Sequence, residues 1–332
     1  MRLLGAWLVL FTHSAALLGH PAVLDFGWAT YGLAIFFTLS GALVSGSARR
    51  SRGIADFFLR RVRRIVPAYL ACSLGTVLVI WPLCSPLPWL HTLRPDHWIP
   101  VWLRLLTHGA QWNLPETFGT HLFASANGSV WSIPYEVLLY AGLGTAWFGF
   151  LVRSRLPSIL PALLWGGTVA LFLWNPSWLP DGDVRLAGFR ILHLVNFLGF
   201  FAGGWTLSLY RLSTRNLAWL SLILFLLRIL MHRSSLVPGL DMALIPLLVL
   251  WIGRHEIVPG RSLPDWSYGF YLWGWPVQQT LIHFRPDLTT LQLAFLATLF
   301  TLPIAAVSWH WVEAPLLKRK PSLKANPDVL GS

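Results

Sequence analysis

The sequence predicts an all-α integral membrane protein with about ten transmembrane helices and both termini in the cytoplasm. Of the 332 residues, 55% are hydrophobic and only 11% are charged, whereas soluble domains carry roughly a quarter of charged residues. The chain also contains 20 Trp residues, whose indole rings favour the membrane–water interface. These observations argue against a water-soluble enzyme built around a single core.

The expected membrane spans are apolar stretches of spanning length or close to it. They lie at 3–19, 28–47, 65–83, 130–152, 156–174, 187–208, 216–231, 236–252, 266–283 and 290–312. If the N-terminus is cytoplasmic, most of the 25 Lys and Arg residues fall on the cytoplasmic side, as is typical of membrane proteins. Topology therefore accounts for the net charge of +12, and we expect no nucleic acid partner.

We expect residues 1–317 to form one polytopic domain and the basic tail 318–332 to be disordered. The long loop 84–128 is predicted to face outward, and its segment WIPVWLRLL to lie flat in the interface. The expected location is the plasma (inner) membrane of a bacterium, with several crossings. The sequence makes no prediction about oligomeric state.

The first predicted span carries a histidine, His13, in an otherwise apolar run. A cleaved signal peptide is a weak explanation because nine further spans follow, and a packing histidine bonded to a neighbouring helix is the ordinary one. Arg2 lies eleven residues earlier, on the same helix face and about 16 Å away along the axis. An ionisable group at mid-membrane depth is a candidate functional residue, and a neutral histidine is suited to act as a base.

The loop after the second span is rich in arginine and forms a second candidate site. Arg61 and Arg64 are three residues apart and share one face of a helix that leads into the third span. With Arg2 they could form an anion site that faces the cytosol, since guanidinium groups suit phosphate. Arg60 with Arg63 is an alternative pair that the sequence leaves open.

Such a site requires a ligand with a polyanionic end and a reactive group on a long arm. The anionic end would stay at the cytoplasmic rim while the arm reaches His13. Acyl-coenzyme A has this shape, so we expect acetyl-CoA or another acyl-CoA as co-substrate.

Two acidic residues are further candidates. Glu136 lies about 10 Å deep in the fourth span, a depth comparable to that of His13, so a His13–Glu136 pair is feasible and would raise the basicity of the imidazole. A glutamate bonded within the helix bundle is an equally good explanation. Glu313 is expected to pair with one of the loop arginines. The other histidines lack metal-ligand spacing, and we expect no metal site.

Five stretches, together with Arg2 and His13, resemble the acyltransferase 3 family of integral-membrane O-acyltransferases. They are FFTLSGALVSG (36–46), FFLRRVRRIVPAYL (57–70), WSIPYEVLLYA (131–141), SYGFYLWGWPV (267–277) and VEAP (312–315). The resemblance implies that His13 is catalytic and that Arg2, Arg61 and Arg64 contact acyl-CoA. The sequence departs from the family at Gly274, where members often have a histidine.

The function hypothesis is a membrane-bound O-acyltransferase. It would move an acyl group, acetyl by resemblance, from acyl-CoA to a hydroxyl of a glycan or related acceptor, with membrane lipid around it. His13 would serve either as a base or as a transient acyl carrier. The alternative is a polytopic transporter or scaffold without acyl transfer.

Overall fold

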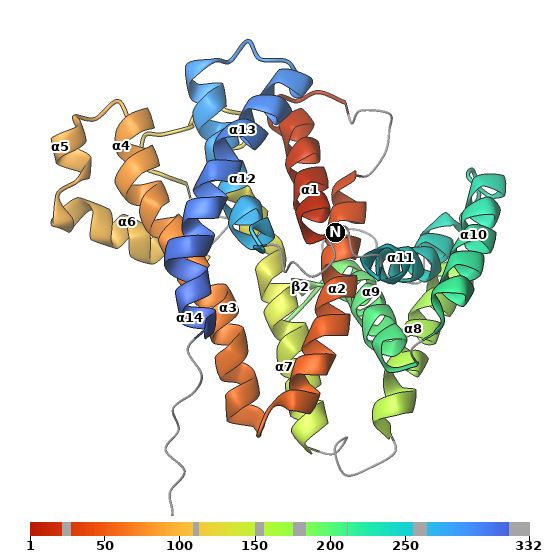
Figure 1. Cartoon of the computed structure of the whole chain (residues 1–332). Coiled ribbons are helices and arrows are strands. Elements are labelled where there is room, and N and C mark those ends of the chain that lie inside the picture. Colours follow the sequence, from red (N-terminus) through yellow and green to blue (C-terminus); the bar gives the residue numbers. More distant parts are fainter. Residues whose placement is uncertain are drawn as a thin grey trace, which may run out of the picture.

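The computed structural model describes residues 1–21, 28–108, 113–149, 156–174, 184–210, 212–254 and 264–318. Within these residues the protein is a bundle of helices, as the sequence predicts (Figure 1). The strands described there form a single antiparallel hairpin, in which β1 (Arg185–Leu186) pairs with β2 (Phe189–Arg190) just before a long helix.

A helix coincides with each of the ten apolar segments. These helices are α1 (Arg2–Leu17), α2 (Trp28–Arg50), α3 (Ile54–Gly75), α7 (Ile133–Gly149), α8 (Leu156–Trp174), α9 (Ile191–Tyr210), α10 (Thr214–Leu230), α11 (Val237–Gly253), α12 (Ser267–Phe284) and α13 (Thr290–Ser308). A short 3-10 helix, η4 (Gly128–Ser132), leads into α7. Two helices are extended through a π-helical turn: α3 through η2 (Thr76–Ile80) into α4 (Trp81–Cys84), and α13 through η7 (Trp309–Glu313) into α14 (Ala314–Lys318).

Four of the described helices are long and apolar enough to cross a membrane, by length and composition alone: Trp28–Arg50, Ile54–Cys84, Ile191–Tyr210 and Thr290–Leu317. Shorter apolar helices accompany them, among them Arg2–Leu17 and Val237–Gly253. The count of ten crossings and the cytoplasmic position of both termini stay predictions. The tail after Lys318 lies outside the described residues.

The predicted outer loop contains two helices, α5 (Trp89–Thr92) and α6 (Pro95–His108), which with α4 stand to one side of the bundle (Figure 1). The segment WIPVWLRLL is part of α6, and its flat position in the membrane interface stays a prediction. Val101 and Leu105 on α6 pack into a small core with Val77 and Trp81, while Leu103 faces outward and is 52% exposed.

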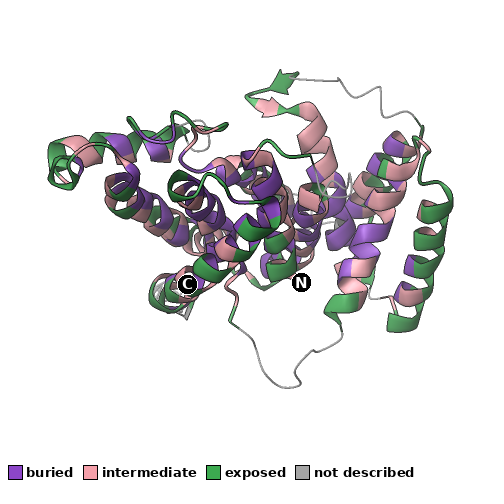
Figure 2. Cartoon of the chain, turned by 90° about the horizontal axis from the view of Figure 1, so that it is seen from above, coloured by how far each residue is buried: buried purple, intermediate pink, exposed green. Residues whose placement is uncertain are grey.

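Helix α2 lies at the centre of the bundle and packs closely against two others. Gly5 of α1 and Gly32 of α2 face each other, so the backbones of these helices approach closely. On the other side, a Cβ at Gly41 would collide with the carbonyl oxygen of Phe201, and one at Gly204 with that of Thr38. Small residues let helices approach in this way. Figure 2 shows buried residues where the helices meet and exposed ones along their outer sides.

Helices α3 and α12 are joined differently, through side chains. The hydroxyl of Tyr268 on α12 donates to the carbonyl oxygen of Ile65 on α3 at 3.2 Å, and the ring of Trp273 lies against Gly75. Helix α7 packs on α3 through Gly144, which faces Phe57. Helices α2, α3, α7 and α12 thereby surround the space described below.

We expect Gly41→Ala and Gly204→Ala each to lower the free energy of unfolding by about 1–3 kcal/mol, because an added methyl group forces α2 and α9 apart. The measurement is thermal unfolding of the purified protein in detergent. Gly142→Ala on α7 is the matched control, since no described atom lies within 4 Å of the added Cβ, and it should be neutral or slightly stabilising. Equal melting temperatures for all three variants would contradict the packing described here.

Candidate active site

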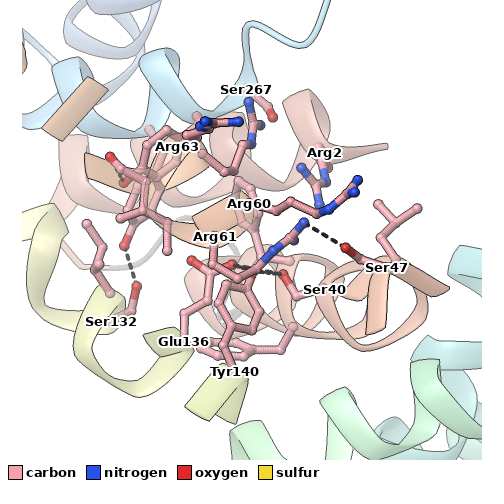
Figure 3. Close-up of a pocket in the computed structure, with 18 of the residues that line it drawn as sticks. Arg2, Ser40, Ser47, Arg60, Arg61, Arg63, Ser132, Glu136, Tyr140 and Ser267 are labelled. Atoms are coloured by element: carbon pink, nitrogen blue, oxygen red, sulfur yellow. Dashed lines mark hydrogen bonds between the residues drawn. The ribbon is translucent and has the colours of Figure 1, made fainter. Parts of the chain in front are cut away.

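A cavity of about 630 Å³ lies between α2, α3, α7 and α12, and Arg2 at the start of α1 reaches it (Figure 3). Among the described residues, six arginines line it: Arg2, Arg50, Arg60, Arg61, Arg63 and Arg64. The remaining described wall is hydroxyl-bearing, aromatic and aliphatic, and Glu136 supplies its one carboxylate. The structure thus brings Arg2, Arg61 and Arg64 to one cavity, and it brings the alternative pair Arg60 and Arg63 there too.

Arg64 is the centre of an ion-pair network at this cavity. Its Nη2 donates to Oδ2 of Asp265 at 2.6 Å, and its Nη1 donates to Oε2 of Glu313 at 3.1 Å. Nη1 of Arg2 donates to the same Asp265 oxygen at 3.1 Å. Glu313 is only 1% exposed, and its expected pairing with a loop arginine is confirmed.

Asp265 is a site residue that the sequence reasoning missed. It lies immediately before α12, next to the SYGFYLWGWPV stretch, and its Oδ1 accepts a hydrogen bond from the hydroxyl of Ser267. Burial alone would raise the pKa of the Asp265 carboxyl, but the charges of Arg64 and Arg2 outweigh it and hold this pKa below its ordinary value. The group is therefore ionised at neutral pH.

Arg61 is held by neutral groups. Its Nη2 donates to the hydroxyl of Ser47 at 3.2 Å, and its guanidinium lies over the ring of Tyr140, 5.8 Å from the centroid. Its Nε is buried without a hydrogen-bond partner in the described structure, and so is Nε of Arg2. Arg60, in contrast, makes a bidentate ion pair with Asp56, in which Nε donates to Oδ1 at 3.1 Å and Nη2 donates to Oδ2 at 3.0 Å.

The carboxylate of Glu136 is bonded within the helix bundle. It accepts hydrogen bonds from the hydroxyl of Ser40 at 2.9 Å and from that of Tyr140, one turn along α7. Figure 3 shows Glu136 and Tyr140 directed towards Ser40 on α2. No hydrogen bond between Glu136 and His13 occurs among the described residues, so the paired arrangement considered from the sequence is absent there.

His13 lies farther along α1 and is not among the residues that line the cavity. Its ring stands edge-to-face on Trp275 of α12, with centroids 4.9 Å apart. One turn earlier on α12, Tyr271 lines the cavity; its hydroxyl bonds to Ser132 at 2.7 Å, and its ring meets Phe36 edge-on. The end of the cavity and the contact of His13 therefore lie on successive turns of one helix.

Gly274 lies where α12 approaches α1. A Cβ there would lie 3.3 Å from Cδ1 of Leu10, so a larger side chain requires Leu10 to move. The next turn of α12 fixes the same helix pair, because Nε2 of Gln278 donates to the carbonyl oxygen of Leu10 at 2.8 Å and to the hydroxyl of Ser14. Glycine at this position is thus compatible with close packing of the helix that carries His13.

The acyltransferase domain family matches residues 1–310, and the chain belongs to this family. It is 28% identical to the O-acetyl transferase of Shigella phage Sf6, over 96% of this chain and 95% of that protein. It is 27% identical to nodulation protein 10 of Rhizobium leguminosarum bv. viciae, over 98% and 94%. It is 25% identical to the putative peptidoglycan O-acetyltransferase YrhL of Bacillus subtilis, over 88% of this chain and 52% of that protein. No solved structure matches.

The family match confirms the resemblance and identifies the protein as an acyltransferase that transfers groups other than amino-acyl groups. It favours the enzyme over the transporter or scaffold alternative. Together with the long apolar helices, it makes the chain a membrane protein. Within the described part of the chain, no group of three or more His, Cys, Asp or Glu side chains is placed to hold a metal ion.

We expect Arg64→Gln to lower the free energy of unfolding by about 3–5 kcal/mol, because it leaves the buried Glu313 carboxylate without its positive partner. Adding Glu313→Gln should restore part of that loss, since the buried charge is removed as well. The measurement is thermal unfolding of the wild type, both single variants and the double variant, which together form a double-mutant cycle. Strictly additive losses would show that the two side chains are not coupled.

Proposed function

We propose that this protein transfers an acyl group, acetyl by preference, from acyl-coenzyme A to a hydroxyl of a glycan or related acceptor. The observation that carries the proposal is a cavity whose described lining combines six arginines with aromatic and hydroxyl groups, in which Ser47 of α2 lies beside Arg61 and Phe36, three turns away on the same helix, lies beside Tyr271. This combination suits a donor with a polyanionic nucleotide and a neutral arm that ends in a thioester. We further propose that the protein lies in the lipid of a bacterial inner membrane.

The phosphates of the donor would bind to Arg2, Arg61 and Arg64. Arginine forks form strong, charge-assisted bonds to phosphate oxygens, and all three guanidinium groups line the cavity. The pantetheine arm would then run along α12, past Tyr268 and towards Tyr271. To reach His13 it must pass the present end of the cavity, beside Tyr271 and Phe36.

His13 is the proposed catalytic residue. As a base it would take the proton of the acceptor hydroxyl while that oxygen forms a bond to the thioester carbonyl carbon; the C–S bond then breaks and the CoA thiolate leaves. In the two-step alternative, the imidazole nitrogen first takes the acyl group from sulfur and then passes it to the acceptor oxygen. Both routes give the same products.

Glu136, which the sequence offered as a partner of His13 in catalysis, stays in the proposal as a positioning residue within the cavity. It faces Ser40 and Tyr140 there, and it lines the same space as Arg61. We propose that this carboxylate and its two hydroxyl partners position the arm of the donor.

The choice of acceptor rests on the relatives. Two of them are named as O-acetyl transferases, and one of these names specifies peptidoglycan, a glycan. These names support a hydroxyl oxygen on a carbohydrate as the acceptor and acetyl as the group transferred. The long loop 84–128, which contains α5 and α6, is the proposed acceptor-facing region.

We expect purified wild-type protein to bind labelled acetyl-CoA and to hydrolyse it slowly without an acceptor. Arg61→Ala should weaken binding about tenfold or more, because a charge-assisted phosphate contact is lost. His13→Ala should bind as well as the wild type while hydrolysis falls by about 10²–10⁴-fold. Arg60→Ala is the matched control and should change binding little, since Asp56 already holds that side chain.

Failure of the wild type to bind any short acyl-CoA would remove the basis of the proposal. Label retained on quenched wild-type protein, and absent from His13→Ala, would select the two-step route over direct transfer.

A further inference from the structure

We propose that Asp265 occupies, in the empty protein, the place that a donor phosphate takes between Arg2 and Arg64, so that this carboxylate and the ligand compete for the two arginines. The inference rests on the proposed function, because it assumes a phosphate-bearing donor at this cavity. It assigns a positioning role to a residue outside the predicted site.

The first argument is the geometry of the contact. A single oxygen, Oδ2 of Asp265, accepts from Arg64 at 2.6 Å and from Arg2 at 3.1 Å. Two guanidinium groups from separate helices therefore converge on one anionic oxygen, which is how they would bind an oxygen of a phosphate. Both arginines line the cavity, so a ligand there can reach the same groups.

The second argument is the difference between the two acidic partners of Arg64. Glu313 is 1% exposed, lies within the continuous helix α13–η7–α14 and also accepts from the hydroxyl of Ser308 at 3.3 Å. Asp265 is 32% exposed and precedes the first turn of α12. Displacing Asp265 requires only the movement of one side chain towards water, whereas displacing Glu313 would bury an uncompensated charge. Asp265 is therefore the partner of Arg64 that a donor phosphate displaces.

The third argument is the set of donors that stay unused. Nε of Arg2 and Nε of Arg61 are buried without a hydrogen-bond partner in the described structure. Buried donors without partners are uncommon and require an explanation. A carboxylate offers two oxygens, and those of Asp265 are already bonded to Arg2, Arg64 and Ser267. A phosphate brings more acceptor oxygens and more negative charge, so it can satisfy these groups once the two guanidinium groups turn towards it.

Asp265 therefore has opposite effects on the stability of the protein without ligand, which it raises, and on the affinity for phosphate ligands, which it lowers. In the empty protein Asp265 lowers the repulsion between Arg2 and Arg64. When the donor binds, the displaced carboxylate remains near the phosphate and repels it. The wild type should therefore bind phosphate ligands less tightly than a protein without this charge.

The test is calorimetric titration of Asp265→Asn with coenzyme A and, separately, with inorganic pyrophosphate, at one fixed ionic strength. Asparagine keeps a side-chain oxygen for Ser267 but removes the charge. We expect the variant to bind both ligands about tenfold more tightly than the wild type, the size expected for removing one unit charge near the ligand in a partly solvated site. Its melting temperature without ligand should fall, and the rise on adding ligand should exceed that of the wild type.

Asp56→Asn is the matched control, because it removes an equal charge from the partner of another cavity-lining arginine, Arg60, which makes no proposed donor contact. Its affinity should stay within about twofold of the wild type. Equal gains in both variants would show a general charge effect and overturn the inference.

The outcomes separate the inference from the proposed function. Unchanged or weaker binding of coenzyme A by folded Asp265→Asn, with normal binding by the wild type, overturns the inference and leaves the proposed function intact. Tighter binding of pyrophosphate by the variant, with no binding of coenzyme A by either protein, supports the exchange at Asp265 and overturns the proposed donor. If neither ligand binds the wild type, both ideas fail.

Discussion

The site depends on the ion pairs of Arg64. This one side chain joins α3 to the residue before α12 and to the end of the α13–η7 helix, so three helices are tied at a single guanidinium. The six arginines that line the cavity among the described residues would repel one another without nearby carboxylates, and leaving the partly buried ones unpaired is costly. Asp265, Glu313 and Asp56 offset that cost at Arg2, Arg64 and Arg60, while Arg61 relies on a hydroxyl and an aromatic ring.

Much of the fold could be predicted from the sequence because local chemistry determines it. Apolar runs located the helices, and α1 confirms that Arg2 and His13 lie on one helix. Asp265 was missed because it is 201 residues from Arg64, and such a contact depends on which helices pack together. The His13–Glu136 pairing was inferred from the similar depths of the two residues in the membrane. Depth does not determine the direction in which a side chain points, and Glu136 points to Ser40 and Tyr140 instead.

The lining of the cavity changes along α2. Its residues run from Arg50 and Ser47, which accepts a hydrogen bond from Arg61, to Phe36, whose ring meets Tyr271 edge-on. Ser47 and Phe36 are eleven residues apart, so the charged and the aromatic parts of the lining lie about three helical turns apart. His13 is not among the lining residues and contacts Trp275, one turn beyond Tyr271 on α12. This order of groups is the one that the proposed donor, with a charged and a neutral end, requires.

The contacts that hold α2 in place are made by backbone rather than by side chains. Helices α1, α2 and α9 meet at Gly5 with Gly32 and at Gly41 with the carbonyl oxygen of Phe201. A backbone contact cannot be relieved by a change of rotamer, so a side chain added at one of these glycines would displace a whole helix. The displaced helix would take its cavity residues with it: Arg2 on α1, or Ser40 and Ser47 on α2. The composition of distant helix contacts therefore sets the dimensions of the arginine-lined cavity.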